Sequence, residues 1–460
     1  MTKSDNVPKT LTYSERLHRV IPGGAHTYSR GDDQYPANAP QILARGKGAY
    51  VFTPEGAKLL DYGMGLRAVT LGYADERVNA GAAHGMSLGV NLTRASVIEL
   101  EAAERLVALI DGADMVKFAK NGSNVTTAAA KVARAYTGRR YICVPRQHPF
   151  FSFDDWFIGA TALKRGIPAE HHQTTLLFDY GDVRTLQALF DAHPGKIAAV
   201  MLEPATTVGP CATCDADRLN PPNCRNCAGR SANFLVQVQA LCRRHGALFI
   251  LDEMITGFRW HLKGAQQLYD VQPDMTTFGK GMANGFAVAA LVGRREVMEV
   301  GGINRPGQER TFLVSTTHGA EMASLAAFMA ALDIYEEQPV IEHLWRYGAR
   351  LLTGLETLAR EAGVSHAFQM QGNAISMNYV TFDGQGAPSL PLRTLFSQEM
   401  IRGGVLMPWI APSFSHGDAE LEFTLEAARK ALGVYAKALE QGVERFLEGP
   451  AIKPVFRQYN

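Results

Sequence analysis

The chain has 460 residues, of which 46% are hydrophobic and 20% are charged, and its formal net charge is +1. This length exceeds the roughly 150 residues typical of one domain, so we expect two or more lobes. The near-neutral charge argues against nucleic acid or a membrane surface as the main partner. The first residues lack an apolar signal-peptide region and no apolar stretch is long enough to span a bilayer, so we expect a cytoplasmic protein.

The predicted elements change character along the chain. Residues 48–62 predict a strand–turn–strand hairpin with Pro54 and Gly56 at the turn. From about 96 to 300, apolar strands alternate with helices, which indicates an α/β fold with a mostly parallel sheet covered on both faces. Strands are predicted at 115–119, 140–144, 197–203, 247–253 and 287–293, and helices at 98–110, 124–136 and 234–245.

After about residue 325 the pattern is mainly helical, with isolated strands. Helices are predicted at 324–337 and 419–448, and strands at 374–382 and 403–408. This pattern indicates a smaller α+β domain that follows the sheet domain. We therefore expect an N-terminal segment that joins the small lobe, a large α/β domain and a C-terminal small domain, at 1–62, 63–325 and 326–460.

A lysine between two glycines, Lys280, follows a carboxylate, Asp252, along the chain. Asp252 ends a predicted strand, and Lys280 lies in the loop before the next one. Ligands of open α/β sheets bind beyond the carboxyl ends of the strands, so both side chains can face one ligand. Pyridoxal phosphate (PLP) fits this pair, because its aldehyde needs a lysine and its ring nitrogen needs a carboxylate. The alternative is that Asp252 caps a helix and Lys280 is a surface charge.

A third feature is a candidate phosphate site. The strand that ends at Ala119 turns through Asn121, Gly122 and Ser123 into a predicted helix. Free N–H groups at a helix start, with a glycine and a small hydroxyl, bind anions. The alternative is an ordinary N-cap. A phosphate site, a carboxylate and a lysine in this chain order together favour PLP.

Seven segments resemble the class III, fold-type I PLP aminotransferases, and among them the glutamate-1-semialdehyde aminomutase branch. The resemblance spans roughly residues 20–435. It is carried by VIPGGAHTYSRG (20–31), NGSNVTTAAAKVAR (121–134), MLEP (201–204), LFILDEMITGFR (248–259), FGKGMANGF (278–286), STTHGAEMASLAA (315–327) and SHGDAELEFTLEAARKAL (415–432).

The resemblance implies how the cofactor is held. Lys280 would form the Schiff base and move the proton, and Asp252 would pair with the pyridine nitrogen. Gly122, Ser123 and Asn124 would hold the phosphate. Thr317 would reach the phosphate of a neighbouring subunit, which implies a homodimer with shared active sites.

Ring stacking and substrate binding are also assigned from the resemblance. Counting back from DDWFIG (154–159) places the ring-stacking residue at Phe150, with His148 as the alternative. Arg30 and Arg67 are candidates for binding a substrate carboxylate. Tyr28 and Ser29 lie in the glycine-flanked segment that would line the substrate pocket.

Four cysteines form two C-x-x-C pairs with nine residues between them, in an insertion at 208–230. This spacing is typical of a tetrahedral four-thiolate metal site. Zinc is our first interpretation and an iron–sulfur cluster the second. The alternatives are two disulfides or four free thiols. The four residues are Cys211, Cys214, Cys224 and Cys227.

Three functions are consistent with the sequence. The first is an aminotransferase that moves an amino group from a donor to an aldehyde or ketone, such as a sugar or another specialised metabolite. The second is an aminomutase, which moves the amino group within one molecule. The third is an inactive, metal-stabilised binding protein on the same fold, and the presence of Lys280 and Asp252 argues against it.

Overall fold

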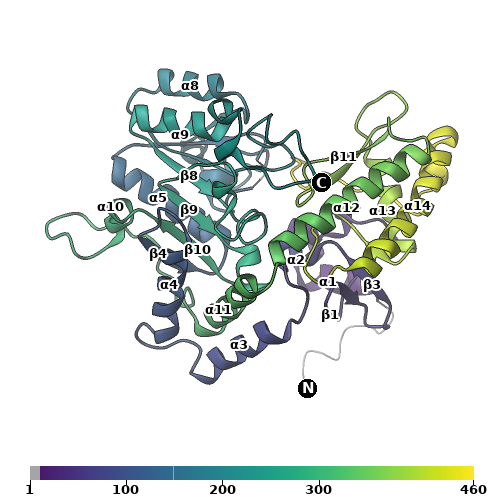
Figure 1. Ribbon diagram of the computed structural model, residues 1–460, viewed down its shortest axis with the longest axis horizontal. Helices are drawn as coiled ribbons and strands as arrows, with labels where there is room; N and C mark the ends of the chain where they lie inside the picture. Colours follow the sequence, from purple (N-terminus) through teal and green to yellow (C-terminus); the bar gives the residue numbers. More distant parts are fainter. Residues whose placement is uncertain (1–10, 149, 460) are drawn as a thin grey trace. The chain divides into compact units, whose positions relative to one another are not determined.

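A computed structural model describes residues 11–148 and 150–459, and the chain forms two compact units (Figure 1). Unit 1 comprises Met1–Met64, Tyr347–Gln371 and Met377–Asn460. Unit 2 comprises Gly65–Arg346 and Gly372–Ser376. Each unit has its own sheet and its own apolar core.

Unit 2 is built on a seven-stranded sheet of order β4-β10-β9-β8-β7-β5-β6. Only β10 runs antiparallel to its neighbours β4 and β9, so the predicted mostly parallel sheet is confirmed. The strands are β4 (Met115–Ala119), β5 (Tyr141–Pro145), β6 (Thr175–Phe178), β7 (Ile197–Leu202), β8 (Leu248–Asp252), β9 (Met275–Phe278) and β10 (Ala289–Gly293).

Helices cover both faces of this sheet, which explains why its central strands are apolar throughout. All residues of β7 and β8 are buried. Helix α5 (Gly122–Thr137) packs on the face that carries Met201 and Ile250. Helix α9 (Phe234–His245) packs on β7 and β8, and its Cys242 lies beside Val200 on the opposite face.

The remaining helices of unit 2 are mostly short, apart from three longer ones. Helix α11 packs on both α3 and α4. Helix α4 begins after Ser96, whose hydroxyl accepts the Glu99 N–H as an N-cap. The helices are α2 (Met64–Arg67, at the unit boundary), α3 (Glu76–Ser87), α4 (Val97–Leu109), α6 (Asp155–Ile158), α7 (Ala169–His172), α8 (Val183–Ala192), α10 (Arg295–Met298) and α11 (Met322–Glu337), with 3-10 turns η5 (Cys224–Asn226), η6 (Arg230–Ala232), η7 (Ala265–Gln267), η8 (Lys280–Ala283) and η9 (Glu299–Gly301).

Unit 1 combines two small sheets with long helices, as predicted for an α+β lobe. The predicted hairpin is confirmed as the antiparallel pair β2–β3 within the sheet β1-β2-β3-β13, and β11 pairs with β12. The elements are α1 (Tyr13–Val20), β1 (Arg45–Lys47), β2 (Tyr50–Phe52), β3 (Lys58–Asp61), α12 (Val340–Glu361, which begins in unit 2), β11 (Phe368–Gln371), β12 (Asn378–Thr381), α13 (Leu390–Arg402), β13 (Val405–Leu406) and α14 (Asp418–Gln441), with 3-10 turns η2 (Pro22–Gly24), η3 (Tyr28–Arg30), η4 (Asp32–Gln34) and η10 (Val443–Arg445).

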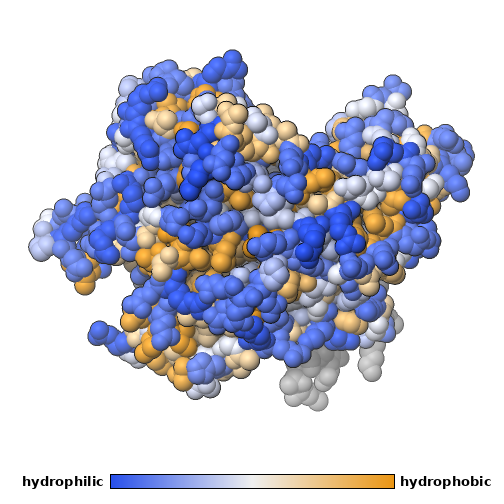
Figure 2. Space-filling model, viewed as in Figure 1, coloured by the Kyte–Doolittle hydropathy of each residue, from blue (hydrophilic) through white to orange (hydrophobic). Residues whose placement is uncertain are grey.

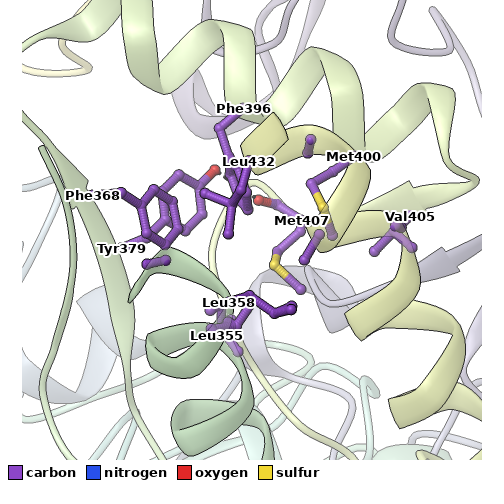
Figure 3. Close-up of a cluster of buried hydrophobic side chains, with 14 of the residues drawn as sticks. Leu355, Leu358, Phe368, Tyr379, Phe396, Met400, Val405, Met407 and Leu432 are labelled. Carbon is purple, nitrogen blue, oxygen red and sulfur yellow. Dashed lines mark hydrogen bonds between the residues drawn. The ribbon is translucent and has the colours of Figure 1, made fainter. Parts of the chain in front are cut away.

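The core of unit 1 lies between α12, α13 and α14 (Figure 3). Phe368 and Tyr379 stack with ring centroids 5.8 Å apart, and Tyr379 donates a hydrogen bond to the Met407 carbonyl at 3.0 Å. Leu355 of α12 and Leu432 of α14 pack in the same cluster. Among the described residues, no helix combines the length and the apolar character needed to cross a bilayer.

Candidate active site

The carboxyl ends of three adjacent strands of unit 2 carry the candidate site. Asp252 is the last residue of β8, and Glu203 follows β7 directly. Lys280 comes two residues after β9 and begins the turn η8. Strands β7, β8 and β9 are hydrogen-bonded neighbours, so these three side chains start from one edge of the sheet.

Asp252 is a buried carboxylate with one partnered oxygen. Its Oδ1 accepts hydrogen bonds from the Met254 N–H and the Thr277 hydroxyl, both at 3.0 Å. Burial raises the pKa of Asp252 to about 6, and the Lys280 charge and these hydrogen bonds limit the rise. Among the described residues no hydrogen bond reaches Oδ2, so this oxygen can bind a cationic group of a ligand.

Close packing explains the glycines on both sides of Lys280. A Cβ on Gly279 would lie 2.6 Å from the Met254 sulfur, and one on Gly281 would lie 2.7 Å from the Thr70 hydroxyl. Lys280 itself has a φ of 36°, in the left-handed region that a non-glycine residue adopts only when its surroundings enforce it. The loop therefore has room for one long side chain, in a fixed place.

The amine of Lys280 is buried, and its pKa is shifted downward. Burial lowers the pKa of Lys280, while the charges of Asp252 and Glu203 oppose this shift and that of Arg67 adds to it. A lysine whose pKa is lowered can accept a proton at a pH where a free lysine cannot. The four residues thus form one group of interacting charges.

Glu203 is the member of this group that the sequence analysis did not assign. Burial and then the Asp252 charge raise the pKa of Glu203, and Lys280 and Arg67 counteract the rise. Its position directly after an apolar strand is the same signal that marks Asp252. Arg67 lies within the group as predicted for a carboxylate-binding candidate, and its backbone φ is 68°.

The start of α5 carries the residues predicted to bind an anion. The N-cap residue Asn121 accepts the Asn124 N–H at 3.0 Å, and the Ser123 hydroxyl accepts the Phe153 N–H at 3.0 Å. No hydrogen bond of the described residues uses the N–H groups of Gly122 or Ser123. These two donors, together with the helix dipole, suit a phosphate.

Met254 links the anion site to the lysine loop. Its sulfur lies 3.0 Å from the place where a Cβ on Gly122 would be, and 2.6 Å from the corresponding place on Gly279. Met254 also donates its N–H to Asp252. The three predicted cofactor motifs therefore meet around one side chain.

The two candidates for ring stacking have different surroundings. Phe150 is 46% exposed and makes an edge contact with Phe157. His148 is buried, and its Nδ1 accepts the Glu203 N–H at 3.1 Å. Burial lowers the pKa of His148 to about 3, so the ring is neutral. The exposed ring of Phe150 suits stacking better than the enclosed ring of His148.

The other predicted residues come from separate segments of the chain. Tyr28, Ser29 and Arg30 belong to unit 1, where they form the 3-10 turn η3, and Tyr28 is exposed. Thr317 is an exposed residue of unit 2, and its carbonyl accepts a hydrogen bond from Asn91 at 3.0 Å.

The four insertion cysteines do come together. Their sulfur atoms all lie within 4.8 Å of one another, and those of Cys211 and Cys227 are 3.9 Å apart. Two N–H groups point at sulfur: Asn233 Nδ2 at 3.1 Å from Cys224 Sγ, and the Gly229 amide at 3.2 Å from Cys227 Sγ. N–H donors of this kind stabilise thiolates.

Comparison with known proteins identifies the family. The sequence profile of the class III aminotransferases matches residues 32–217 and 227–405. The chain belongs to the class III aminotransferases. It is accordingly a PLP-dependent enzyme of fold-type I. The profile skips residues 218–226, a gap that begins between the two C-x-x-C pairs and includes Cys224.

Relatives in this family have different named activities. A glutamate-1-semialdehyde 2,1-aminomutase of Thermus thermophilus is 31% identical over 444 residues, covering 92% of this chain and 99% of the relative. The 3-aminobutyryl-CoA aminotransferase of Cloacimonas acidaminovorans is 27% identical, with 95% and 100% covered. The FumI protein of Sphingopyxis sp. MTA144, solved in its PLP internal aldimine form, is similar with a TM-score of 0.80, 26% identity and 93% and 97% coverage.

The residues present suit PLP. The free Oδ2 of Asp252 is an acceptor for a protonated ring nitrogen, and the Gly122 and Ser123 N–H groups are donors for a phosphate. Lys280 is the amine between them in the same group. Each part of the cofactor thus has a partner of matching charge.

Proposed function

We propose that this chain is an aminotransferase that moves an amino group between an amino donor and an aldehyde or keto substrate through Lys280. The observation that carries the proposal is the buried group in which Lys280 has a lowered pKa beside Asp252 and Glu203. When bound, PLP supplies an electron sink for the pair of electrons left on the substrate carbon.

The side chains divide the remaining work. Lys280, as a neutral amine, takes the proton from the substrate α carbon and returns it at the carbon that receives it. The negative charge of Asp252 keeps the ring nitrogen protonated. The guanidinium of Arg67 binds the substrate carboxylate, and Phe150 packs on the ring face. Tyr28, Ser29 and Arg30 remain proposed pocket residues.

The test is a Lys280→Ala variant beside a Lys263→Ala control. Lys263 lies in the preceding connection, between β8 and β9, and its amine pairs with Asp111 at 3.0 Å. With 15N-glutamate and a panel of carbonyl acceptors, wild type and Lys263→Ala should form 2-oxoglutarate and labelled amine. Lys280→Ala should form none and should lose the borohydride-sensitive absorbance band of bound PLP. Full activity in Lys280→Ala would disprove the assignment.

An aminomutase is the second candidate, because a relative with that name is 31% identical. An aminomutase converts one amino aldehyde into its isomer and consumes no second amino donor. Offering glutamate-1-semialdehyde alone distinguishes the two: conversion to its amino ketone isomer with no other amino donor present would favour the mutase over the transaminase.

We also propose a homodimer with shared active sites. Met86, Leu88, Val90 and Leu92 are 40–53% exposed along the α3–α4 connection, where Figure 2 shows apolar colour at lower left. Next to them, residues 91–96 line a hollow of about 350 Å³ together with Thr317, the proposed phosphate ligand of the second subunit. An apolar, exposed strip of this kind fits a second copy.

Substitution within this strip tests the dimer. Leu92→Asp should give monomers in light scattering and reduce PLP affinity, because Thr317 would no longer reach a neighbouring cofactor. Val20→Asp, at another exposed apolar position in unit 1, should change neither. A Leu92→Asp protein that stays dimeric would contradict the proposed interface.

The four clustered cysteines are proposed to bind zinc. Ligands about 2.3 Å from a tetrahedral ion lie about 3.8 Å apart, close to the 3.9 Å between two of these sulfurs. Elemental analysis should find one zinc per chain in wild type and in Cys242→Ala, and none in Cys227→Ala. Iron with sulfide would instead indicate a cluster. Because all six cysteines are free of disulfides, we propose the cytoplasm as the compartment.

A further inference from the structure

The cysteine insertion has almost no core of its own. Between Val208 and Arg230 most residues are exposed, and the buried ones are Pro210, Cys211, Pro222 and Cys224. Its regular structure is limited to the single turns η5 and η6. Such a polar segment cannot offset the entropy of ordering it by apolar burial, so a bound metal would fix its conformation.

We propose that the insertion, once folded around its metal, is a clasp that holds two other segments of unit 2, residues 268–270 and 372–374. The clasp rests on the metal site proposed above. In this proposal the metal acts by positioning backbone, and its site is distant in sequence from Lys280 and Asp252.

The first held segment is the turn that follows η7. The Cys224 N–H donates to the Leu268 carbonyl at 2.8 Å. The Asn233 amide nitrogen contacts both the Cys224 sulfur at 3.1 Å and the Tyr269 carbonyl at 3.0 Å. A metal ligand and its hydrogen-bonding partner thus bind consecutive carbonyls of this turn.

Charged and polar side chains of the insertion complete this contact. Arg225 and Arg230 both bind the Asp270 carboxylate, at 3.3 and 2.5 Å. Asp215 accepts the Tyr269 hydroxyl at 2.8 Å through one oxygen and the N–H of Cys211 at 2.9 Å through the other. Residues near both C-x-x-C pairs therefore contact the same three residues, 268–270.

The second held segment is reached by Arg218, which lies between the C-x-x-C pairs. Its Nε donates to the Gly372 carbonyl at 2.8 Å, and its own carbonyl accepts the N–H of the buried Ala374 at 2.7 Å. Residues 372–376 belong to unit 2, although the strands on both sides of them belong to unit 1. Arg218 is also the first residue of the gap in the family match, so this contact is a property of the insertion.

Loss of the metal should release both segments. A hydrogen bond between neutral groups contributes about 0.5–1.5 kcal/mol net, so several contacts made by one ordered loop stabilise the segments jointly. Without metal, the loop samples many conformations, so each contact with the held segments must offset the entropy of ordering the loop. The amide of Ala374 then loses its acceptor, which hydrogen exchange detects directly.

The experiment compares full-length, PLP-loaded proteins by hydrogen-exchange mass spectrometry. In Cys227→Ala, peptides covering 268–270 and 372–376 should exchange about tenfold faster than in wild type, and the peptide covering Lys280 should be unchanged. Cys242→Ala is the matched control, since Cys242 is buried in α9 away from the cluster, and it should exchange like wild type.

A second variant separates the clasp from the metal. Arg218→Ala should keep its zinc and speed exchange at 372–376 alone, and Arg218→Lys should restore part of the protection. Unchanged exchange at 372–376 in Cys227→Ala, after measured zinc loss, would overturn the clasp and leave the zinc site standing. If the wild-type protein contains no zinc and hydrogen exchange is unchanged in every variant, both the clasp and the zinc site would be overturned.

Discussion

Two connections at the same edge of one sheet are held in contrasting ways. The loop after β9, which carries Lys280, is fixed by packing: the side chain of Met254 and the hydroxyl of Thr70 leave no room for a Cβ on either flanking glycine. The connection after β7 has few buried residues, and it has four thiols within 4.8 Å instead. A loop that must place a reactive amine is part of the core, whereas the connection that contains the gap in the family match has little core and four adjacent thiols.

The largest expected effect is at the carboxylate of the first connection. Asp252→Asn should reduce turnover on the order of 100- to 1,000-fold, because the ring nitrogen loses its charged partner. The PLP-free variant should be more stable than wild type at pH 8, since it no longer buries a carboxylate whose pKa is raised to about 6. Thermal unfolding and steady-state kinetics measure the two effects.

The control for this variant is Asp274→Asn. Asp274 Oδ2 accepts the Phe249 N–H at 2.7 Å at the start of β9, and it pairs with Arg294. This change should lower stability and leave turnover nearly unchanged. Equal loss of turnover in the two variants would show that the Asp252 result reflects folding alone.

Packing of the lysine loop predicts a large loss of stability from a single methyl group. Gly279→Ala should destabilise the protein by about 1–3 kcal/mol, because its Cβ would lie 2.6 Å from the Met254 sulfur. Gly433→Ala, in the exposed part of α14 with nothing within 4 Å, should stabilise by about 0.5–1 kcal/mol. Denaturant unfolding gives both values, and a neutral Gly279→Ala would mean that the loop is adaptable.

The pH dependence of stability tests the buried charges. The pKa of Glu203 rises from 4.5 to about 8 on folding, so the unfolded chain loses its proton first and stability falls as pH rises between these values. Glu203→Gln should remove this part of the decline in the PLP-free protein, most visibly near pH 8. Parallel pH profiles for the two proteins would show that Glu203 is ionised throughout.

The smallest expected effect concerns the cysteine connection. Cys227→Ala should leave the absorbance of bound PLP unchanged, because no residue of the insertion contacts Lys280 or Asp252 through any hydrogen bond of the described residues. A spectrophotometric titration with PLP measures this. A shifted band would show that the two connections are coupled, and the contrast between them would then be less sharp.

Sequence patterns were sufficient to predict an element where a single short segment contains all the information that defines it. The run IAAVML gives β7 and the capping pattern at Asn121 gives the start of α5. The reversed direction of β10 was not predicted, although the connection from β9 is too short for the crossover that a parallel strand needs. Strand β6 and helices α12 and α13 were also missed.

The features that the sequence did not predict depend on contacts between segments that are distant in sequence. The sequence alone does not assign Glu203 a role, because its charge partner Arg67 lies far away in sequence. Likewise, nothing in the sequence near Arg218 indicates that its guanidinium binds Gly372, which is 154 positions later. Such pairs follow from the fold, and a pattern with a period of two or 3.6 residues carries no information about them.

The thioether of Met254 has a consequence for how this chain can evolve. It fills the space beside two glycines that are far apart in sequence, Gly122 at the anion site and Gly279 at the lysine loop. A side chain at either glycine would require the Met254 thioether to move. Descendants of this chain should therefore change the three positions in a set order, with the methionine shortened before either glycine is replaced.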